Sequence, residues 1–428
     1  MQTEDNGSLP VAPILSPNDR RNFAAGIWHG AFLAMGTSLT QPTTVISALV
    51  ADLTGSTVWV GGLSTVLTVA GALPQLFVAR SIEPRPRKMP YLLLAIYMRV
   101  ISWAVLAWLI FAIGSQRPMV LAWILVGMLV IFYVGGGIGG IPYTDIIGKI
   151  IPIQRRGAFF GGKGAVAGPL SVGAALAARH IMANVAYPNN YALLFGLAAI
   201  GLAVASLGFW AIREPPGAST DQRVRPWREY RSQLAAATRR MKMLLAAQLL
   251  TGFSLMALPF YVVYARSQLG APLGAVGWFL LAQVLGGTLS NLVWARLVDR
   301  TNARRMLFFC ATVSTLTPLL AIALGQLGWQ ALLPVFFLAG ATFDGRNVGF
   351  QSALLEVAPA NERTTYAGLN AVLNLPVALL PLLAGLLLRQ WSYPALFLLA
   401  AVFIGTGALL IRRWANKPPP PVEEGSRD

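Results

Sequence analysis

The stretch ARLVDRTNARR, residues 295–305, gathers charged residues between two long apolar runs. The charged residues are Arg296, Asp299, Arg300, Arg304 and Arg305. We expect the flanking runs to form helices over residues 273–298 and 305–326, each with the roughly 20 residues needed to cross a bilayer core about 30 Å thick. A short charged loop between two such runs indicates a turn at a membrane surface.

The composition of the whole chain agrees with this interpretation. Of its 428 residues, 56% are hydrophobic and only 11% are charged, whereas soluble domains carry about 25% charged residues. The single cysteine, Cys310, lies in an apolar run, so neither an internal disulfide nor a thiol metal cluster is possible. The first 19 residues are acidic and proline-bearing and do not resemble a cleaved signal peptide. These features predict an all-α integral membrane protein.

Apolar runs of spanning length recur along the chain and predict twelve transmembrane helices. We expect them at 23–49, 57–79, 89–113, 119–147, 157–182, 190–212, 242–265, 273–298, 305–326, 329–354, 364–388 and 392–413. The longest connection, 213–241, is polar and rich in arginine, and it divides the chain into halves of six spans. The expected organisation is an N-terminal tail (1–20), a bundle (21–212), the linker (213–241), a second bundle (242–414) and a disordered tail (415–428).

The charge distribution predicts the orientation in the membrane. The net charge of +17 could suggest nucleic acid, but the basic residues form short clusters between apolar segments. Most of the 33 Lys and Arg residues fall at the termini and in the loops on the same side; Arg117, Arg179, Arg266 and Arg389 fall on the other side. The positive-inside rule then places both termini in the cytoplasm of a plasma (inner) membrane protein, and no nucleic-acid partner is expected.

The two halves repeat each other. At a constant offset of 207 residues, KIIPIQRRGAFFGGKGAVAGP (149–169) aligns with EVAPANERTTYAGLNAVLNLP (356–376), and Pro152, Arg156 and Pro169 recur as Pro359, Arg363 and Pro376. A second pair is ARSIEPRPRKM (79–89) with ARLVDRTNARR (295–305). Each pair occupies the same loop of its half. Parallel six-helix repeats are typical of transporters whose halves rock about a central site.

The chain resembles the major facilitator superfamily over residues 20 to 414. The loop signature of that family is G-x-x-x-D-[RK]-x-G-x-[RK]-[RK], and Asp299, Arg300, Arg304 and Arg305 stand at its charged positions, whereas Ala295 and Asn302 replace its glycines. The first copy is weaker, with Glu83 for the acid and Lys88 for a base. The resemblance implies two pseudo-symmetric six-helix bundles that bind a solute near the bilayer midplane.

These loops predict a cytoplasmic gate. A carboxylate at a helix end can accept from a neighbouring helix N-terminus and pair with arginine, and such pairs must break when the cytoplasmic side opens. Asp299 is the expected switch residue; the alternative is that the arginines only determine topology. The predicted gate comprises Glu83, Lys88, Arg156, Asp299, Arg300, Arg304, Arg305 and Arg363.

Polar residues inside the spans predict a solute pathway. In the first span, His29, Gly36, Thr40, Thr43 and Ser47 lie within about 40° of one line on a helical wheel. This stripe is expected to line the cavity. His29 can change charge near neutral pH, although a lone buried histidine is also a common structural group.

The tenth span, which includes TFDGRNVGFQ, adds an acid and a base at depth. Asp344 shares its face with Asn347 and Gln351, and Arg346, two residues on, points away. Ionisable groups at this depth cost about 2.5–3.5 kcal/mol and therefore face the interior. Asp344 is the expected proton-coupling residue; a structural salt bridge is the alternative.

Four further polar residues complete the set. For Arg99 we expect a structural partner within the protein in preference to a ligand. For Lys163 we expect a side chain that extends toward the membrane surface. If two of Arg99, Lys163, Arg346 and His29 reach the cavity, an anionic solute is favoured. In the eleventh span, Asn370 and Asn374 share a face. The glycine run GGGIGGIP (135–142) lacks the lysine of a phosphate loop and predicts close helix packing.

We therefore predict a monomeric secondary transporter, a symporter or antiporter, that moves a small organic solute by alternating access with protons as coupling ion. No cofactor, metal site or enzymatic activity is expected. Proton antiport of drugs or metabolites is an alternative, since Gly164, Gly168, Pro169 and Gly173 partly resemble the antiporter motif of the family. A membrane sensor or lipid scramblase on the same scaffold is the alternative from another class.

Overall fold

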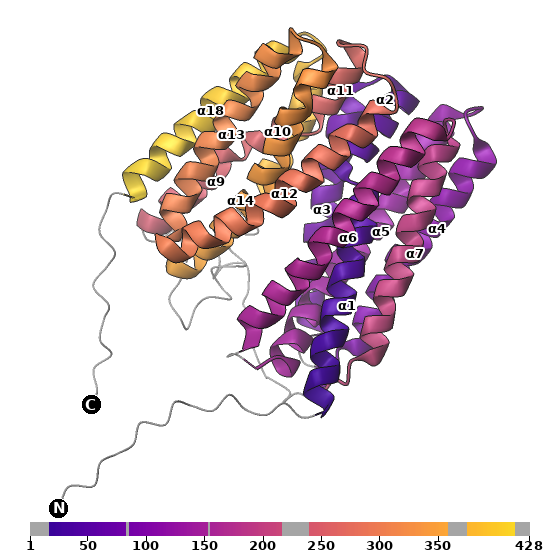
Figure 1. The fold of residues 1–428 in the computed structure, drawn as a ribbon, viewed down its shortest axis with the longest axis vertical. Helices are drawn as coiled ribbons and strands as arrows, with labels where there is room; N and C mark the ends of the chain where they lie inside the picture. Colours follow the sequence, from indigo (N-terminus) through magenta and orange to yellow (C-terminus); the bar gives the residue numbers. More distant parts are fainter. Residues whose placement is uncertain (1–16, 83–84, 153–154, 216–238, 358–374, 416–428) are drawn as a thin grey trace, which may run out of the picture.

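The computed structural model describes residues 17–82, 85–152, 155–215, 239–357 and 375–415, and almost all of these residues are helical (Figure 1). The N-terminal half contains α1 (Pro17–Leu39), η1 (Pro42–Ile46), α2 (Ser47–Thr54), α3 (Thr57–Ile82), α4 (Met89–Ile113), α5 (Pro118–Ile150), α6 (Arg156–Asn184) and α7 (Asn189–Ala211). The C-terminal half contains α9 (Arg239–Thr251), α10 (Phe253–Ala257), α11 (Phe260–Ser267), α12 (Ala275–Arg300), α13 (Ala303–Gly325), η3 (Trp329–Leu332), α14 (Leu333–Val357), α16 (Leu375–Ala378), α17 (Leu380–Leu387) and α18 (Tyr393–Ala415). Each predicted span overlaps one helix or one run of consecutive helices.

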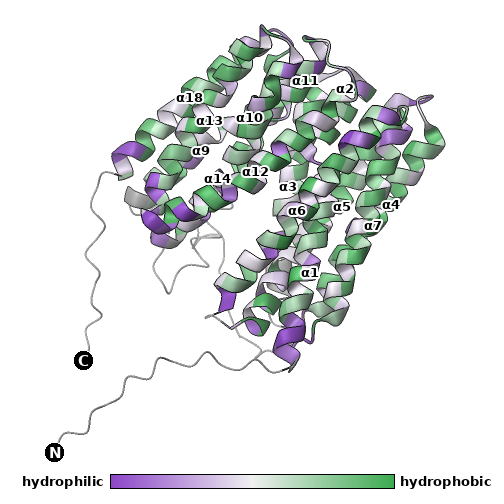
Figure 2. Cartoon of the chain, viewed as in Figure 1, coloured by the Kyte–Doolittle hydropathy of each residue, from purple (hydrophilic) through white to green (hydrophobic). Residues whose placement is uncertain are grey.

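The outer surface is apolar along the middle of the helices (Figure 2). In the described part of the chain, nine segments are long and apolar enough to cross a membrane. Large side chains on this surface are open to the surroundings: Trp108 is 65% exposed, Phe111 67% and Trp123 64%. Such extensive apolar exposure is unfavourable in water and favourable in lipid, so the predicted membrane protein is confirmed.

The helices form two bundles with the same internal pairing. In the N-terminal half, α1 packs on α7, α4 packs on α5 and α7, and α3 packs on α5. The corresponding helices of the C-terminal half repeat this arrangement, because α9 packs on α18, α13 packs on α14 and α18, and α12 packs on α14. The predicted duplication of a six-helix unit is therefore confirmed in three dimensions.

The two halves meet through α3 against α17 and α6 against α12. Glycines allow the close approach: a Cβ at Gly61 would overlap the carbonyl oxygen of Pro381, and one at Gly385 would overlap that of Thr57. On α6 and α12, the contacts extend from the end opposite the termini to about mid-helix, where a Cβ at Gly168 would lie 2.8 Å from the Thr288 methyl group. Figure 1 shows the halves close together at that far end and further apart at the terminal end, where both termini lie.

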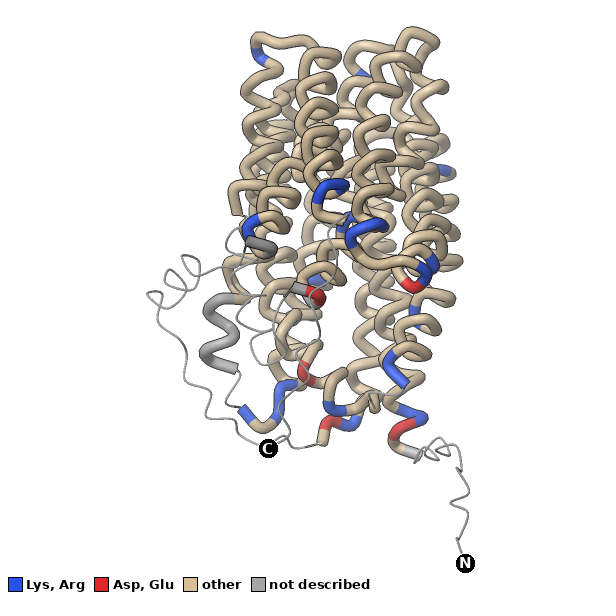
Figure 3. Tube along the Cα trace, turned by 90° about the vertical axis from the view of Figure 1, so that its left-hand side faces the viewer, with Lys and Arg blue, Asp and Glu red and all other residues tan. Residues whose placement is uncertain are grey.

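Charged residues are concentrated at the terminal end (Figure 3). The end of α5, the start of α6 and the turn between α12 and α13 lie at the same end as the start of α1 and the end of α18, as the charge count predicts (Figure 1).

The first span is not one continuous helix, contrary to our expectation. The α-helix stops at Leu39, and a π-helical turn begins at Pro42, since proline cannot donate the backbone hydrogen bond that would continue the ladder. The corresponding seventh span is interrupted near Gly252 and again at Pro259. Pro42 and Pro259 hold matching places in the two halves, a repeat that the sequence comparison missed.

Candidate substrate pathway and gates

A cavity of about 160 Å³ lies inside the N-terminal half. It is lined by residues of α1, α4, α5, α6 and α7, and this lining is apolar except for a few side chains. The lining residues are His29, Leu33, Leu92, Ala95, Ile96, Arg99, Gly135, Gly136, Gly139, Gly140, Tyr143, Lys163 and Phe209. Three of the four intramembrane basic residues considered in the sequence, His29, Arg99 and Lys163, thus share one cavity.

Arg99 and Lys163 both point inward, which corrects the expectation for Lys163. The Arg99 guanidinium carbon lies 4.3 Å from the centroid of the Phe132 ring. Lys163 does not extend toward the surface, because its methylene chain lies against Gly30, where a Cβ would overlap it. Its ammonium donates to the Tyr143 hydroxyl at 3.4 Å and lies 5.5 Å from the centroid of that ring.

His29 is buried at the edge of this cavity. Its ring stacks on Phe209 with centroids 3.6 Å apart, and its Nδ1 lies 3.1 Å from the carbonyl oxygen of Ala205. A carbonyl can only accept, so Nδ1 carries the proton and Nε2 remains for another contact. His29 therefore has both a structural bond and a place in the cavity wall.

The other residues of the first-span stripe do not line this cavity. Gly36 faces α7, where a Cβ would lie 3.1 Å from the Ala198 carbonyl oxygen. Thr40 is buried, and its hydroxyl has no hydrogen-bond partner within the described ranges. Thr43 accepts from Gln283 of the other half at 2.8 Å, and Ser47 donates to the carbonyl of Pro42. Because the helix is broken between α1 and η1, the polar residues of the first span do not lie along one line as they would on a continuous helix.

The glycine run in α5 serves two purposes. Gly135 and Gly139 permit close packing of α4, since a Cβ on either would lie 3.0 Å from an atom of Ala95. Gly136 and Gly140 line the cavity, and a Cβ on either would meet no atom within 4 Å. The packing role agrees with the sequence, whereas the open space beside Gly136 and Gly140 was not foreseen.

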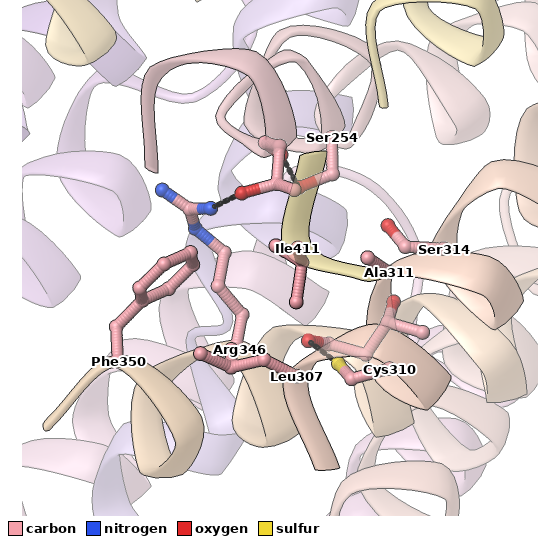
Figure 4. Close-up of a pocket in the computed structure, with 10 residues that line it drawn as sticks. Ser254, Leu307, Cys310, Ala311, Ser314, Arg346, Phe350 and Ile411 are labelled. Atoms are coloured by element: carbon pink, nitrogen blue, oxygen red, sulfur yellow. Dashed lines mark hydrogen bonds between the residues drawn. The ribbon is translucent and has the colours of Figure 1, made fainter. Parts of the chain in front are cut away.

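Arg346 occupies a separate small pocket in the C-terminal half (Figure 4). It donates to the Thr251 hydroxyl and to the Gln248 carbonyl oxygen, the latter at 3.0 Å. Its guanidinium carbon lies 4.8 Å from the centroid of the Phe350 ring. The pocket has room for only about 10 Å³ of additional volume, so the contacts of Arg346 tie α14 to α9.

Asp344 points away from Arg346, as the helical wheel predicts. Its Oδ2 accepts from the Asn291 amide of α12 at 3.3 Å. The same oxygen lies close to Gly287, where a Cβ would be 2.6 Å from it. Asp344 forms no ion pair with any described residue, which argues against the alternative of a structural salt bridge. Asn347 and Gln351, which we expected on the same face, are exposed.

A pair of opposite charges closes the far end between the two halves. Asp52 of α2 accepts from Arg266 of α11 at 2.7 Å, and the Tyr191 hydroxyl lies 3.5 Å from the same carboxylate. We did not predict this pair from the sequence, where Arg266 serves only as a marker of topology. The signal in the sequence that could have predicted it is an isolated acid, Asp52, near the far end of the first span and an isolated base, Arg266, near the far end of the seventh.

At the terminal end, each ion pair formed by described residues stays within one half. Lys88 pairs with Asp145 at 3.1 Å, and Lys149 pairs with Asp145 at 2.6 Å. Glu214 caps α4 by accepting from the backbone amides of Lys88 and Met89 at 2.9 Å, and it also pairs with Lys149. Negative charge at a helix N-terminus is favourable, so this cluster stabilises the N-terminal bundle.

The C-terminal half repeats this arrangement with different residues. Arg304, which aligns with Lys88, pairs with Glu356 at 3.4 Å and lies over the Trp414 ring. Glu356 also accepts from the backbone amide of Ala303 at the start of α13. The carboxylate that holds this helix N-terminus is therefore Glu356, where we expected Asp299.

The remaining gate residues make no contact across the halves in the described ranges. Asp299, Arg300 and Arg305 are exposed, and Asp299 has no ion-pair partner there. Arg156 donates to the carbonyl oxygens of Gly148 and Ile151 and so joins the end of α5 to the start of α6. The predicted residues Glu83, Arg363, Asn370 and Asn374 lie outside the described residues.

These features define a polytopic α-helical protein with the repeated-bundle fold of solute transporters. Residues 244–428 match the family described as Major Facilitator Superfamily. This match covers the C-terminal part of the chain, and the fold of both bundles agrees with it.

Solved structures of several transporters share the fold over nearly the whole chain. A bacterial homologue of the iron transporter ferroportin in an inward-facing state has a TM-score of 0.69 at 12% identity, covering 94% of this chain and 100% of the other. The nucleoside transporter NupG has a TM-score of 0.63 at 14% identity, with 94% and 100% covered. A POT family transporter in complex with a thioalcohol-conjugated peptide has a TM-score of 0.67 at 12% identity, with 93% and 96% covered. No curated protein is significantly similar in sequence.

Proposed function

We propose that this protein is a secondary transporter that moves a small organic solute by alternating access and is coupled to protons. The observation that carries the proposal is the asymmetry of contact between the repeated bundles. They are joined at the far end by Asp52 and Arg266, whereas the ion pairs at the terminal end stay within each half. Two rigid bundles with one closed end can expose a site between them to one side at a time.

The positive-inside rule assigns the terminal end to the cytoplasm. In that orientation the structure represents an inward-facing state. The exposed Asp299 then fits the role of an open latch, which would find its partner across the halves only when the cytoplasmic side closes.

The structural neighbours support transport in general without specifying the solute. By their titles they include an iron transporter homologue, a nucleoside transporter and a transporter in complex with a conjugated peptide. Since one fold carries such different solutes, the solute must be inferred from side chains of this chain.

Asp344 is the proposed proton-coupling residue. It lies in α14 next to α12, has a neutral hydrogen-bond partner in Asn291, and has no cationic partner among the described residues. A carboxylate without a compensating cation is expensive to keep charged in the membrane. Protonation therefore removes an energetic penalty and can be linked to the movement of the two helices.

The test is transport in proteoliposomes with a screened solute panel and an imposed pH gradient. The wild type should accumulate a solute only with the gradient, and Asp344→Asn should lose this accumulation while retaining solute exchange. The direction of the productive gradient separates symport from antiport. Asp19→Asn, a carboxylate change in the first turn of α1, should behave as the wild type.

Two results would contradict the proposal. Unchanged gradient-driven accumulation in Asp344→Asn would remove this residue from coupling. The absence of movement of every solute under every gradient would favour a sensor or scramblase.

A further inference from the structure

We propose that the cavity of the N-terminal half binds the anionic end, a carboxylate or phosphate, of the transported solute through Arg99 and Lys163. This inference rests on the proposed transport function and names the chemical class of its solute. The site is the cavity lined by residues of α1, α4, α5, α6 and α7.

The described lining of the cavity lacks a counter-charge for its two cations. No Asp or Glu is among the described residues that line the cavity. The Arg99 guanidinium has no hydrogen-bond partner in the described part of the chain, and its Nε is buried. Lys163 donates only to the neutral Tyr143 hydroxyl there, at the long distance of 3.4 Å. Two cations therefore face one space with most of their donors unused.

The surrounding structure holds both cations in place. Gly30 provides the groove in which the Lys163 chain lies, and Gly135 clears the Arg99 chain, since a Cβ there would lie 3.1 Å from the Arg99 Cγ. The Phe132 ring supports the guanidinium from one side. A Lys or Arg side chain that reaches the membrane surface needs no such packing, because water there solvates its charge.

Arg99 differs in its surroundings from Arg346 of the C-terminal half. That guanidinium is bonded to Thr251 and Gln248 and leaves only about 10 Å³ of free space. Arg99 is similarly stacked on a phenylalanine but borders about 160 Å³ of space and has no such bonds to any described residue. One arginine is structurally satisfied, and the other is available to a ligand.

The size of the cavity suits one end of a solute. Its volume is about 160 Å³, whereas one water molecule occupies about 30 Å³ in the liquid, so the cavity can hold more than a few waters. It is smaller than the pockets of roughly 300–1,000 Å³ that enclose drug-sized ligands. Guanidinium and ammonium groups are the usual partners of carboxylate and phosphate. Leu33, Ile96 and Phe209 supply an apolar wall for the adjoining carbon atoms.

The test is ligand binding to the purified full-length protein in detergent, measured by thermal unfolding and titration. The probes share one ring and differ in charge: benzoate, phenyl phosphate, neutral benzamide and cationic benzylamine. At saturation, benzoate or phenyl phosphate should raise the Tm by about 2–5 °C, and the two identify which anion is preferred. Benzamide and benzylamine should leave the Tm unchanged.

Variants assign the binding to the cavity. Arg99→Gln and Lys163→Gln should each weaken the Kd of the anion about 10- to 100-fold, as expected for loss of a charge-assisted hydrogen bond. Gly140→Val should also abolish binding by filling the cavity, and it should fold because its Cβ has free space. Arg117→Gln removes an exposed cation at the start of α5 and should bind as the wild type.

The inference is overturned if neither anion stabilises the wild type, if benzamide stabilises it equally, or if the Arg99→Gln, Lys163→Gln double variant retains the wild-type affinity. Its failure is distinguishable from failure of the proposed function. Gradient-driven movement of a neutral solute without anion binding would refute only the anion site. Anion binding without movement of any solute would refute only transport.

Discussion

At the scale of single residues, Arg346 shows how a buried cation can be stabilised with no counter-ion among the described residues. Its partners are the Thr251 hydroxyl, a backbone carbonyl and an aromatic ring. The sequence placed Arg346 in the solute pathway because it lies deep in a span. Its contacts instead connect α14 with α9, so its main effect should be on stability.

Thr251→Val should therefore destabilise the protein. The substitution preserves the shape of the side chain but leaves a guanidinium donor unpaired in a buried site, which costs about 1–3 kcal/mol. Thermal unfolding in detergent measures the effect. Thr312→Val is the matched control, since Thr312 is exposed and bonds only to its own helix. Equal Tm values for the two variants would contradict the structural role of Arg346.

At the scale of helices, glycines determine how closely the elements pack. α12 and α14 approach reciprocally: a Cβ at Gly286 would overlap the Phe337 carbonyl oxygen, and one at Gly340 would overlap that of Gln283. Small residues at helix interfaces allow such backbone contact in membranes. This contact also positions Asp344 against α12.

Gly340→Ala should push α14 away from α12 and destabilise the protein by about 1–3 kcal/mol, as overpacking does. Since Asp344 lies one turn away on α14, gradient-driven transport should decline as well. Gly127→Ala is the control, because a Cβ there meets no atom within 4 Å. Unfolding temperatures that fall equally for both variants would show that helix flexibility, and not close contact, causes the loss.

At the scale of the whole molecule, the Asp52–Arg266 pair links the two halves at the far end. Both side chains are partly buried, with exposed fractions of 19% and 22%. The pair exists only while this end is closed, so it stabilises the state seen here relative to the state open at the far end. Its contribution sets part of the equilibrium between the two states.

Asp52→Asn or Arg266→Gln should increase the population open at the far end about five- to thirty-fold, the equivalent of about 1–2 kcal/mol. Spin labels attached at Ser56→Cys and Ser392→Cys, which lie on far-end loops of opposite halves, measure the opening. The distance between the two labels should be longer in these variants than with the intact ion pair. The only native cysteine, Cys310, is buried and should remain unlabelled.

The charge-swapped double variant Asp52→Arg, Arg266→Asp should recover part of the closed population. Arg389→Gln, which removes an exposed far-end charge, should not change the distance distribution. A distribution that is insensitive to Asp52 and Arg266 would show that the packing of α3 on α17 and of α6 on α12 closes this end without the ion pair.

The sequence by itself determined where the membrane spans lie, that they form two matched sets, and on which side of the membrane the basic residues gather. It could do so because hydropathy and charge act locally along the chain. It also separated Asp344 from Arg346, since the helical period fixes their directions. The tertiary structure alone decided which partners meet. Asp52 and Arg266 are 214 positions apart, Glu356 takes the place expected for Asp299, and Gly30 turns Lys163 inward beside Arg99. Such contacts depend on how separate helices approach and on which end of the molecule is closed, and neither is encoded in any single span.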